Sequence, residues 1–392
     1  MTSAVIVDTV RTASGRGKPG GALAEVHPVD LLAGVLRSLR TRNDLDPALV
    51  DDVIGGCVSQ VGEQSFNITR KAVLAAGFPE HVPATTIDRQ CGSSQQAAHF
   101  AAQGVLAGAY DVVIACGVES MSRVPMFSSI QDAEQYGAGI ADRYPEGLVQ
   151  QGIAAELLAA RWKLSRDELD DFAARSHRLA ARAAESGAFD REIVGVPVAD
   201  GVHERDETVR PATTAESLAG LRPCFVDEAA ATRFPEIDWR VTPGSSSPLT
   251  DGASATLIMS EERAAALGLR PRARFHTFSV VGDDPTLMLS GVLPATRRVL
   301  ERSGLGIDDL DVFEVNEAFA PVPLLWAAEF GADLDRLNQR GGAIALGHPL
   351  GASGTRLLTT LVNTLEDTGG RYGLQTMCEG GGMANATVIE RL

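Results

Sequence analysis

Four residues far apart along the chain have the types that nucleophilic chemistry requires: Cys91, Asn316, His348 and Cys378. Cys91 directly precedes a run of small residues, 95–102, that is typical of a helix. A cysteine at the start of a helix meets unpaired backbone N–H groups and the positive end of the helix dipole, and both stabilise a thiolate. For this cysteine taken by itself, a buried and inert thiol is the alternative interpretation.

His348 lies in the glycine-rich stretch 340–354, which also opens onto a predicted helix. A histidine in such a turn can simply be held by backbone hydrogen bonds, or it can serve as a base at neutral pH. If two halves of the chain pack about a pseudo-twofold axis, Cys91 and His348 take equivalent positions and can meet. A Cys–His pair is a known way to generate a thiolate.

Cys378 stands between an apolar strand and three glycines, Gly380 to Gly382. Glycines there allow a ligand to approach backbone N–H groups closely, and a core cysteine would not need them. Two thiols and an imidazole fit a reaction with a covalent acyl carrier and a separate proton donor and acceptor. Simple hydrolysis would need only one thiol.

Asn316 follows a buried apolar strand, 312–315. An asparagine in this place is often a helix cap. It can equally hold a water molecule that donates to a developing oxyanion.

The elements that would position these residues occur twice. The loop with Cys91 is followed by a small-residue helix and a strand ending at Cys116, and the loop with His348 is followed by a similar helix and a strand ending at Cys378. We therefore expect two similar α/β halves, each a mixed sheet covered by helices. The intervening stretch 119–241 is more polar, and we expect it to form an exposed insertion outside the sheet.

Composition limits the possible functions. The chain has 392 residues and a net charge of −16, which argues against nucleic acid as a partner but allows a phosphorylated small ligand. Its five cysteines are scattered, which makes a zinc site or a disulfide framework unlikely to fit and favours the reducing cytoplasm. We find neither a secretory signal nor an apolar stretch of the roughly 20 residues that a membrane helix needs.

Taken together, the motifs resemble those of the thiolase family (acetyl-CoA C-acyltransferases and 3-ketoacyl-CoA thiolases) over essentially the whole chain. The matching stretches are 88–93, 117–122, 316–320, 341–354 and 378–382. The resemblance implies a duplicated, five-layered α-β-α-β-α fold with mixed sheets. It divides the chain into an N-terminal half (1–118 plus 242–268), an inserted loop domain over the coenzyme A site (119–241) and a C-terminal half (269–392).

The resemblance also implies roles for the residues. Cys91 becomes S-acylated, His348 activates it, and Cys378 moves the proton at the substrate α-carbon. Asn316, through a water molecule, and His348 form one oxyanion site, while the backbone N–H groups of Cys91 and Gly380 form the other.

For coenzyme A, the resemblance implies contacts from Arg210, Ser217, Leu221 and Ser247. Coenzyme A and acyl-CoA thioesters would bind as substrates, with no metal and no permanently bound cofactor. The family usually forms homodimers or homotetramers, and we expect one of these assemblies here, in the cytoplasm and without a membrane partner.

Departures from the family pattern bear on the substrate. Gln151 stands where acetoacetyl-CoA-forming members usually have Met, Leu289 replaces a usual Gly, and the stretch 233–239 is longer than in the short-chain biosynthetic type. These differences favour degradative cleavage of a 3-ketoacyl-CoA, of fatty-acid or steroid origin, to acetyl-CoA and a shortened acyl-CoA. The reverse Claisen condensation uses the same residues. The alternatives are a biosynthetic acetoacetyl-CoA thiolase, a decarboxylating ketoacyl synthase and a non-catalytic acyl-CoA-binding relative.

Overall fold

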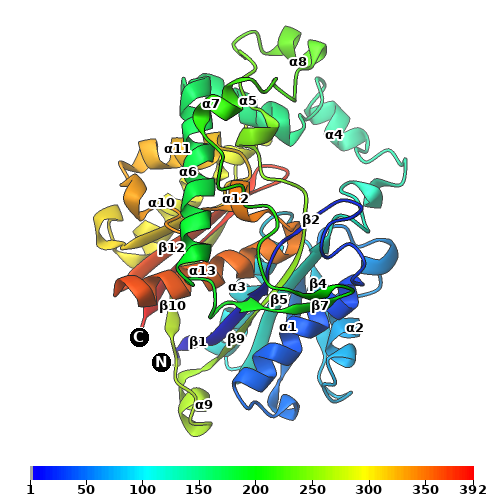
Figure 1. The fold of residues 1–392 in the computed structure, drawn as a ribbon, viewed down its shortest axis with the longest axis vertical. Helices are drawn as coiled ribbons and strands as arrows, with labels where there is room; N and C mark the ends of the chain where they lie inside the picture. The colour runs from blue at the N-terminus through cyan, green and yellow to red at the C-terminus, as the bar shows by residue number, and fades with distance from the viewer. Residues whose placement is uncertain (1–2) are drawn as a thin grey trace.

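The computed structural model describes residues 3–392, so residues 1 and 2 of the predicted N-terminal half lie outside it. Its main sheet has the strand order β11-β12-β13-β10-β1-β9-β5-β3-β4 (Figure 1). The strands of the first half are β1 (Ala4–Thr12), β3 (Asp52–Gly56), β4 (Ala84–Ile87), β5 (Val112–Ser120) and β9 (Thr250–Ser260). Those of the second half are β10 (Ala273–Gly282), β11 (Val312–Val315), β12 (Tyr372–Glu379) and β13 (Met383–Arg391). The two halves join where β1 pairs antiparallel with β10 at Val5 and Ile6.

The same pairing plan occurs in both halves. In the first half β4, β3 and β5 run parallel, and β5, β9 and β1 are antiparallel neighbours. In the second half β11 and β12 run parallel, β12, β13 and β10 are antiparallel neighbours, and a parallel bridge from Phe313 to Leu337 stands in the place of β4. The prediction of two similar α/β halves is therefore confirmed.

Helices form three layers around the two half-sheets (Figure 1). The helices α3 (Ser93–Leu106) and α13 (Ser353–Thr368) pack on each other in the middle and share one apolar core with strands of both halves. The helices α1 (Pro28–Arg42) and α2 (Ile68–Ala75) cover the outer face of the first half. The helices α10 (Val292–Ser303) and α11 (Pro321–Phe330) cover the outer face of the second. This is the predicted five-layered arrangement.

The small residues of α3 explain how the two central helices come so close. Ala97, Ala98, Ala101 and Ala102 are all buried against the shared core. In α13, a side chain at Gly354 would place its Cβ only 2.0 Å from the backbone nitrogen of Gln95. The helices therefore touch backbone to backbone at this point, directly behind the two loops that carry Cys91 and His348.

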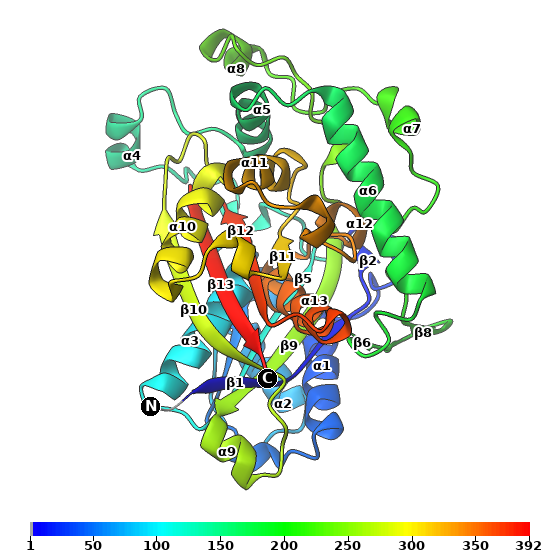
Figure 2. The same cartoon turned by 90° about the vertical axis from the view of Figure 1, so that its left-hand side faces the viewer.

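Most of the remaining helices lie between β5 and β9 in the sequence and gather at one end of the molecule in both views (Figures 1 and 2). They are α4 (Ala138–Arg143), α5 (Gln151–Arg161), α6 (Arg166–Glu185), α7 (Ala215–Ala219) and α8 (Glu228–Arg233). The expectation that this stretch stays outside the sheet is wrong in one place, because β6 (Ile193–Val194) pairs in parallel with the end of β1. The strands β7 (Val196–Val198) and β8 (Gly201–His203) form a separate hairpin. A short part of this stretch therefore joins the main sheet, through backbone hydrogen bonds to the end of β1.

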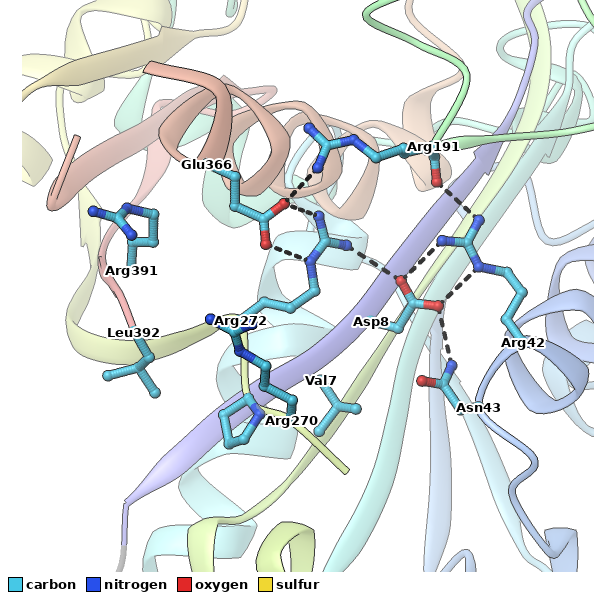
Figure 3. A pocket seen from close by; sticks show the side chains of 11 residues that line it. Val7, Asp8, Arg42, Asn43, Arg191, Arg270, Arg272, Glu366, Arg391 and Leu392 are labelled. Carbon is cyan, nitrogen blue, oxygen red and sulfur yellow. Dashed lines mark hydrogen bonds and ion pairs between the residues drawn. The ribbon is translucent and has the colours of Figure 1, made fainter. Parts of the chain in front are cut away.

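Ion pairs hold the seam between the halves, around a hollow of about 630 Å³ (Figure 3). Asp8 on β1 accepts hydrogen bonds from Arg42 at the end of α1 and from Arg272 just before β10. Arg272 also pairs with Glu366 on α13 through two hydrogen bonds of 2.7 and 2.8 Å. One arginine therefore ties both halves together, far from the four residues with predicted chemical roles. Within residues 3–392, no helix has the length and apolar character to cross a bilayer.

Candidate active site

Cys91 is buried in a tight turn at the start of α3. Gln90, just before it, has a positive φ of 49°, and the Ser93 hydroxyl donates to the Gln90 carbonyl at 2.6 Å. Residue 92 must be glycine, because a Cβ there would lie 1.8 Å from a carboxyl oxygen of Glu379. The Cys91 sulphur receives hydrogen bonds from its own backbone N–H, from the backbone N–H of Gly380 and from the side chain of Gln151.

These donors do not make Cys91 a thiolate at rest. Burial raises the pKa of the Cys91 thiol to about 12, and the nearby Glu379 carboxyl adds to the effect. The three hydrogen bonds lower the pKa by less than burial raises it. The expected stabilisation at the helix start is present, but the low polarity of the buried site outweighs it, and the neutral thiol is the resting form.

His348 is buried just before the 3₁₀ turn that leads into α13, and a hydrogen bond at its Nδ1 holds the ring. Its Nδ1 lies 2.6 Å from the Ser353 hydroxyl, which donates its own proton to the Pro349 carbonyl at 2.8 Å. Nδ1 must therefore carry the ring hydrogen, and Nε2 keeps its lone pair. Burial, with a smaller effect of Arg356, lowers the pKa of His348 to about 3. The ring is a neutral imidazole with an available acceptor.

Asn316 lies next to that acceptor. Its amide nitrogen is 3.4 Å from His348 Nε2, and its backbone N–H donates to the Thr376 carbonyl at 3.0 Å. It does not cap a helix, since α11 begins only at Pro321. Its side-chain oxygen is buried and has no hydrogen-bond partner within residues 3–392. Asn316 and His348 thus present one donor and one acceptor side by side.

Cys378 and Gly380 face the nucleophile from the end of β12. Cys378 is buried, and its pKa is raised well above the usual value by burial and then by the Cys91 sulphur, so the two thiols are close neighbours. Gly380 is flanked by two amide side chains, with Gln90 Oε1 at 3.1 Å and Gln151 Nε2 at 3.4 Å from the place where a Cβ would stand. The structure therefore brings Cys91, Cys378 and the Gly380 N–H together.

Hydrogen bonds join the His348 loop and the start of α13 to the first half. The Thr355 N–H donates to the Ser94 hydroxyl at 3.0 Å. The buried Glu119 carboxylate accepts from the Gly351 N–H at 2.9 Å and from the Val58 and Ser59 N–H groups at 2.9 and 3.1 Å. Glu119 therefore joins the His348 loop of the second half to a loop of the first.

Two residues of this site, Glu119 and Ser353, had no predicted role, and Gln151 was expected to bear only on the substrate. Glu119 left one signal, since it is a charged residue directly after the apolar run 112–118. A carboxylate so placed needs several hydrogen bonds to stay buried. Ser353 and the position of Gln151 beside Cys91 gave no comparable signal, because their partners are known only once the chain is folded.

The residues predicted to bind coenzyme A lie over the same end of the molecule. Leu221 contacts Gly244, with its Cδ1 2.8 Å from the ideal Cβ position, and Ser247 donates its backbone N–H to Ala318 at 3.0 Å. These two residues therefore border the loop that carries Asn316. Ser217 is exposed, but its hydroxyl donates to the Thr214 carbonyl at 2.7 Å as a helix cap. Arg210 is exposed, and its backbone N–H donates to His177.

A second hollow, of about 840 Å³, opens beside α5. Its walls come from residues 146–153, just before and within the start of α5, and from residues 224–234 around α8. Gln150 and Ile153, on either side of Gln151 in the sequence, line it. The hollow therefore lies next to the element that reaches Cys91.

Comparison with known proteins agrees with this geometry. Residues 4–262 match the family model for the thiolase N-terminal domain, and residues 269–391 match that for the thiolase C-terminal domain. The chain is 48% identical to the steroid 3-ketoacyl-CoA thiolase FadA6 of Mycobacterium tuberculosis, covering 100% of this chain and 95% of that protein. It is 46% identical to a 3-ketoacyl-CoA thiolase of Pectobacterium carotovorum over 100% of both chains.

A solved structure shares the fold over the same length. The crystal structure of the Bacillus anthracis acetyl-CoA acetyltransferase superposes with a TM-score of 0.89 at 38% identity, covering 100% of this chain and 99% of that one. The family models together span nearly every residue, and the relatives match from end to end. The chain belongs to the thiolase family of acyltransferases.

Proposed function

We propose that this thiolase cleaves 3-ketoacyl-CoA with coenzyme A, through an acyl group carried on Cys91, to give acetyl-CoA and a shortened acyl-CoA. The observation that carries the proposal is that two buried thiols and the Gly380 N–H lie together, while Asn316, paired with His348, is hydrogen-bonded to β12, the strand that carries Cys378. For each proton that moves in the reaction, the site has a group that can accept it. For each negative charge that develops, the site has a hydrogen-bond donor.

In the first half-reaction, the Cys91 sulphur attacks the 3-keto carbon while its proton passes to His348 Nε2. Proton transfer accompanies the attack, because a thiol with a pKa of about 12 does not give its proton to an imidazole with a pKa of about 3 beforehand. The C2–C3 bond then breaks, and Cys378 protonates the departing enolate of acetyl-CoA. Hydrogen-bond donors that point at each oxyanion lower the activation barriers of the attack and of the C2–C3 cleavage.

In the second half-reaction, the thiol of free coenzyme A gives its proton to the Cys378 thiolate and attacks the thioester on Cys91. The backbone N–H groups of Cys91 and Gly380 stabilise the oxyanion, and the Cys91 sulphur leaves with the proton that His348 took up in the first half-reaction. Run backwards, the same steps form a carbon–carbon bond by Claisen condensation. We propose that coenzyme A acts only as a substrate and that no resident cofactor or metal takes part, since the side chains named here supply each proton transfer.

The nature of the acyl group is part of the proposal. Two relatives are named 3-ketoacyl-CoA thiolase, and one of those names specifies steroids. The hollow of about 840 Å³ beside the start of α5, the helix that begins at Gln151, has room for a bulky group. We therefore infer a degradative enzyme acting on long or ring-bearing acyl chains of fatty-acid or steroid β-oxidation.

The remaining parts of the proposal concern binding and assembly. We assign residues 119–241 as a loop domain over the coenzyme A site, between the halves 1–118 plus 242–268 and 269–392. Arg210, Ser217, Leu221 and Ser247 would contact coenzyme A there. We place the enzyme in the cytoplasm as a homodimer, or as a homotetramer built from dimers.

The direct test is to trap the acyl-enzyme. Wild-type protein mixed with a labelled 3-ketoacyl-CoA, without free coenzyme A, should carry one acyl group on Cys91, located by peptide mass. The Cys91→Ala variant should carry none and should lose thiolysis. An acyl group found on another residue, or thiolysis that survives in Cys91→Ala, would overturn the proposal.

A substrate panel tests the acyl group. Thiolysis should be measured as kcat/KM from acetoacetyl-CoA to long-chain and ring-bearing 3-ketoacyl-CoAs. A preference for acetoacetyl-CoA would indicate the biosynthetic type instead. Release of carbon dioxide from malonyl-CoA would indicate a decarboxylating synthase.

A further inference from the structure

Gln151 places a side-chain amide at the nucleophile, and the mechanism above does not use it. It is the first residue of α5 and is half-buried. Its Nε2 lies 3.4 Å from the place where a Cβ on Gly380 would stand, and hydrogen bonding from its side chain is one of the effects that lower the pKa of the Cys91 thiol. It is the one side chain among the three donors that reach this sulphur.

Rigid packing holds this amide in place. Gly152, the next residue, leaves no room for a side chain, because a Cβ there would lie 2.1 Å from the ring of Phe225. Phe225 in turn packs edge-on against Phe319, in the loop that follows Asn316, with ring centres 5.7 Å apart. One turn further along α5, the Glu156 carboxylate accepts two backbone N–H groups, from Arg240 and Val241, at 2.8 Å each. The first turn of α5 is therefore fixed to the active site from both sides.

The second amide beside Gly380, that of Gln90, cannot donate a hydrogen bond at this point. Gln90 turns its oxygen toward Gly380, with Oε1 3.1 Å from the ideal Cβ position. Its amide nitrogen points to Asp88, at 3.4 Å from Oδ2. An oxygen only accepts hydrogen bonds. Gln151 is therefore the side chain that can donate to negative charge at this point.

We propose that Gln151 is a catalytic residue of this enzyme, whose amide N–H donates to the Cys91 sulphur while that sulphur carries negative charge. The inference rests on the proposed acyl-Cys91 function and adds a donor to it. An amide gives up no proton, so its effect is purely electrostatic. It acts when the thiol becomes a nucleophile in the first half-reaction and again when the sulphur leaves in the second.

The test compares Gln151→Met with Gln103→Met. Methionine is similar in length and volume to glutamine but has no N–H donor. Gln103 is an exposed glutamine on α3 that does not line the hollow beside α5, so its variant is a matched control. A hydrogen bond to a charged group typically changes a rate by about 10- to 100-fold. We therefore expect Gln151→Met to slow acyl-Cys91 formation by about that factor, with the Gln103→Met rate within about twofold of wild type.

Alkylation of Cys91 by iodoacetamide separates this role from a merely structural one. In Gln151→Met the rise of the alkylation rate with pH should move to higher pH, with an unchanged melting temperature. Gln151→Glu should shift it further in the same direction, because a carboxylate would then oppose the thiolate. An unshifted profile with wild-type acylation in Gln151→Met would overturn the inference, and so would an equal loss in Gln103→Met.

The two proposals fail in different ways. If wild-type enzyme forms no acyl-Cys91, the proposed function fails. If wild-type enzyme forms it and Gln151→Met forms it at the same rate, only the role of the amide fails.

Discussion

A buried thiol and a buried imidazole, both neutral, form the reactive pair that we propose for this enzyme. The pKa of Cys91 is raised to about 12 and that of His348 is lowered to about 3, in each case mainly by burial. Burial disfavours whichever form is charged, so it moves the two pKa values in opposite directions. The resting enzyme therefore protects its nucleophile from unwanted electrophiles until a substrate carbonyl arrives.

This state predicts a simple pH dependence. Between pH 7 and 10, the thiolate fraction of a group with a pKa of about 12 rises about tenfold per pH unit. His348 does not titrate in this range, because its pKa of about 3 lies far below it. The rate of Cys91 alkylation by iodoacetamide, followed by peptide mass, should therefore keep rising up to pH 10. A plateau near pH 7 would show instead that a thiolate–imidazolium pair exists at rest.

At the scale of single residues, the sequence pointed to side chains that the fold buries, but not to their charge. Cys91, His348 and Cys378 lie beside glycines or predicted helix starts, and these local patterns can be recognised in the amino-acid sequence. The protonation state depends on how deeply the folded chain buries each group, which no local pattern specifies. For the same reason Ser353, which fixes the ring hydrogen of His348, could not be identified beforehand.

Among the elements, the connection of the His348 loop to the first half depends on Glu119 at the end of β5. Its carboxylate accepts three backbone N–H groups and the Gln64 amide, at 2.8 to 3.1 Å. In Glu119→Gln, one acceptor oxygen becomes an NH₂ group that faces these donors. Leaving buried donors unpaired costs about 1 to 3 kcal/mol each.

We therefore expect Glu119→Gln to lower the free energy of unfolding by about 2 to 5 kcal/mol. Because Gly351 is one of the donors, the loop that carries His348 should also loosen and kcat should fall. Urea unfolding and steady-state thiolysis would measure the two effects. The control is Glu262→Gln on the exposed surface of α9 (Glu261–Ala266), which should change neither. Wild-type stability in Glu119→Gln would contradict this account of the loop contact.

The order of the elements could be predicted from the sequence, because each element has a local sequence pattern and the series of patterns occurs twice. Loop, small-residue helix and apolar strand occur twice in the same order, and the two half-sheets have the same pairing plan. The short strand Ile193–Val194 was not predicted, although its two β-branched residues favour a strand, because two residues are too few to show an alternating pattern.

For the whole molecule, one edge of the sheet is left open. The strand β4 pairs only with β3 within residues 3–392, and the neighbouring Phe66 is 90% exposed. An unpaired strand edge beside an exposed aromatic ring can bind another chain through backbone hydrogen bonds and apolar contacts. We expect two copies to associate through this edge.

Light scattering coupled to size-exclusion chromatography would test this assembly. Wild-type protein should elute at twice or four times the mass of the 41.3 kDa chain. Phe66→Asp should shift it toward the single-chain mass, since a charge replaces an apolar contact at the edge. Phe127→Asp, an exposed aromatic position outside the edge, is the control and should keep the wild-type mass. A wild-type protein that is a single chain in solution would refute the prediction.

The contact of α3 and α13 at Gly354 has a consequence for how such an enzyme can change over time. The spacing of nucleophile and base is set where two helix backbones touch, at a point that no substrate reaches. The walls of the hollow beside α5 come from a different part of the chain, between β5 and β9. New acyl groups can therefore be accommodated by altering those walls, while the reactive centre keeps its dimensions.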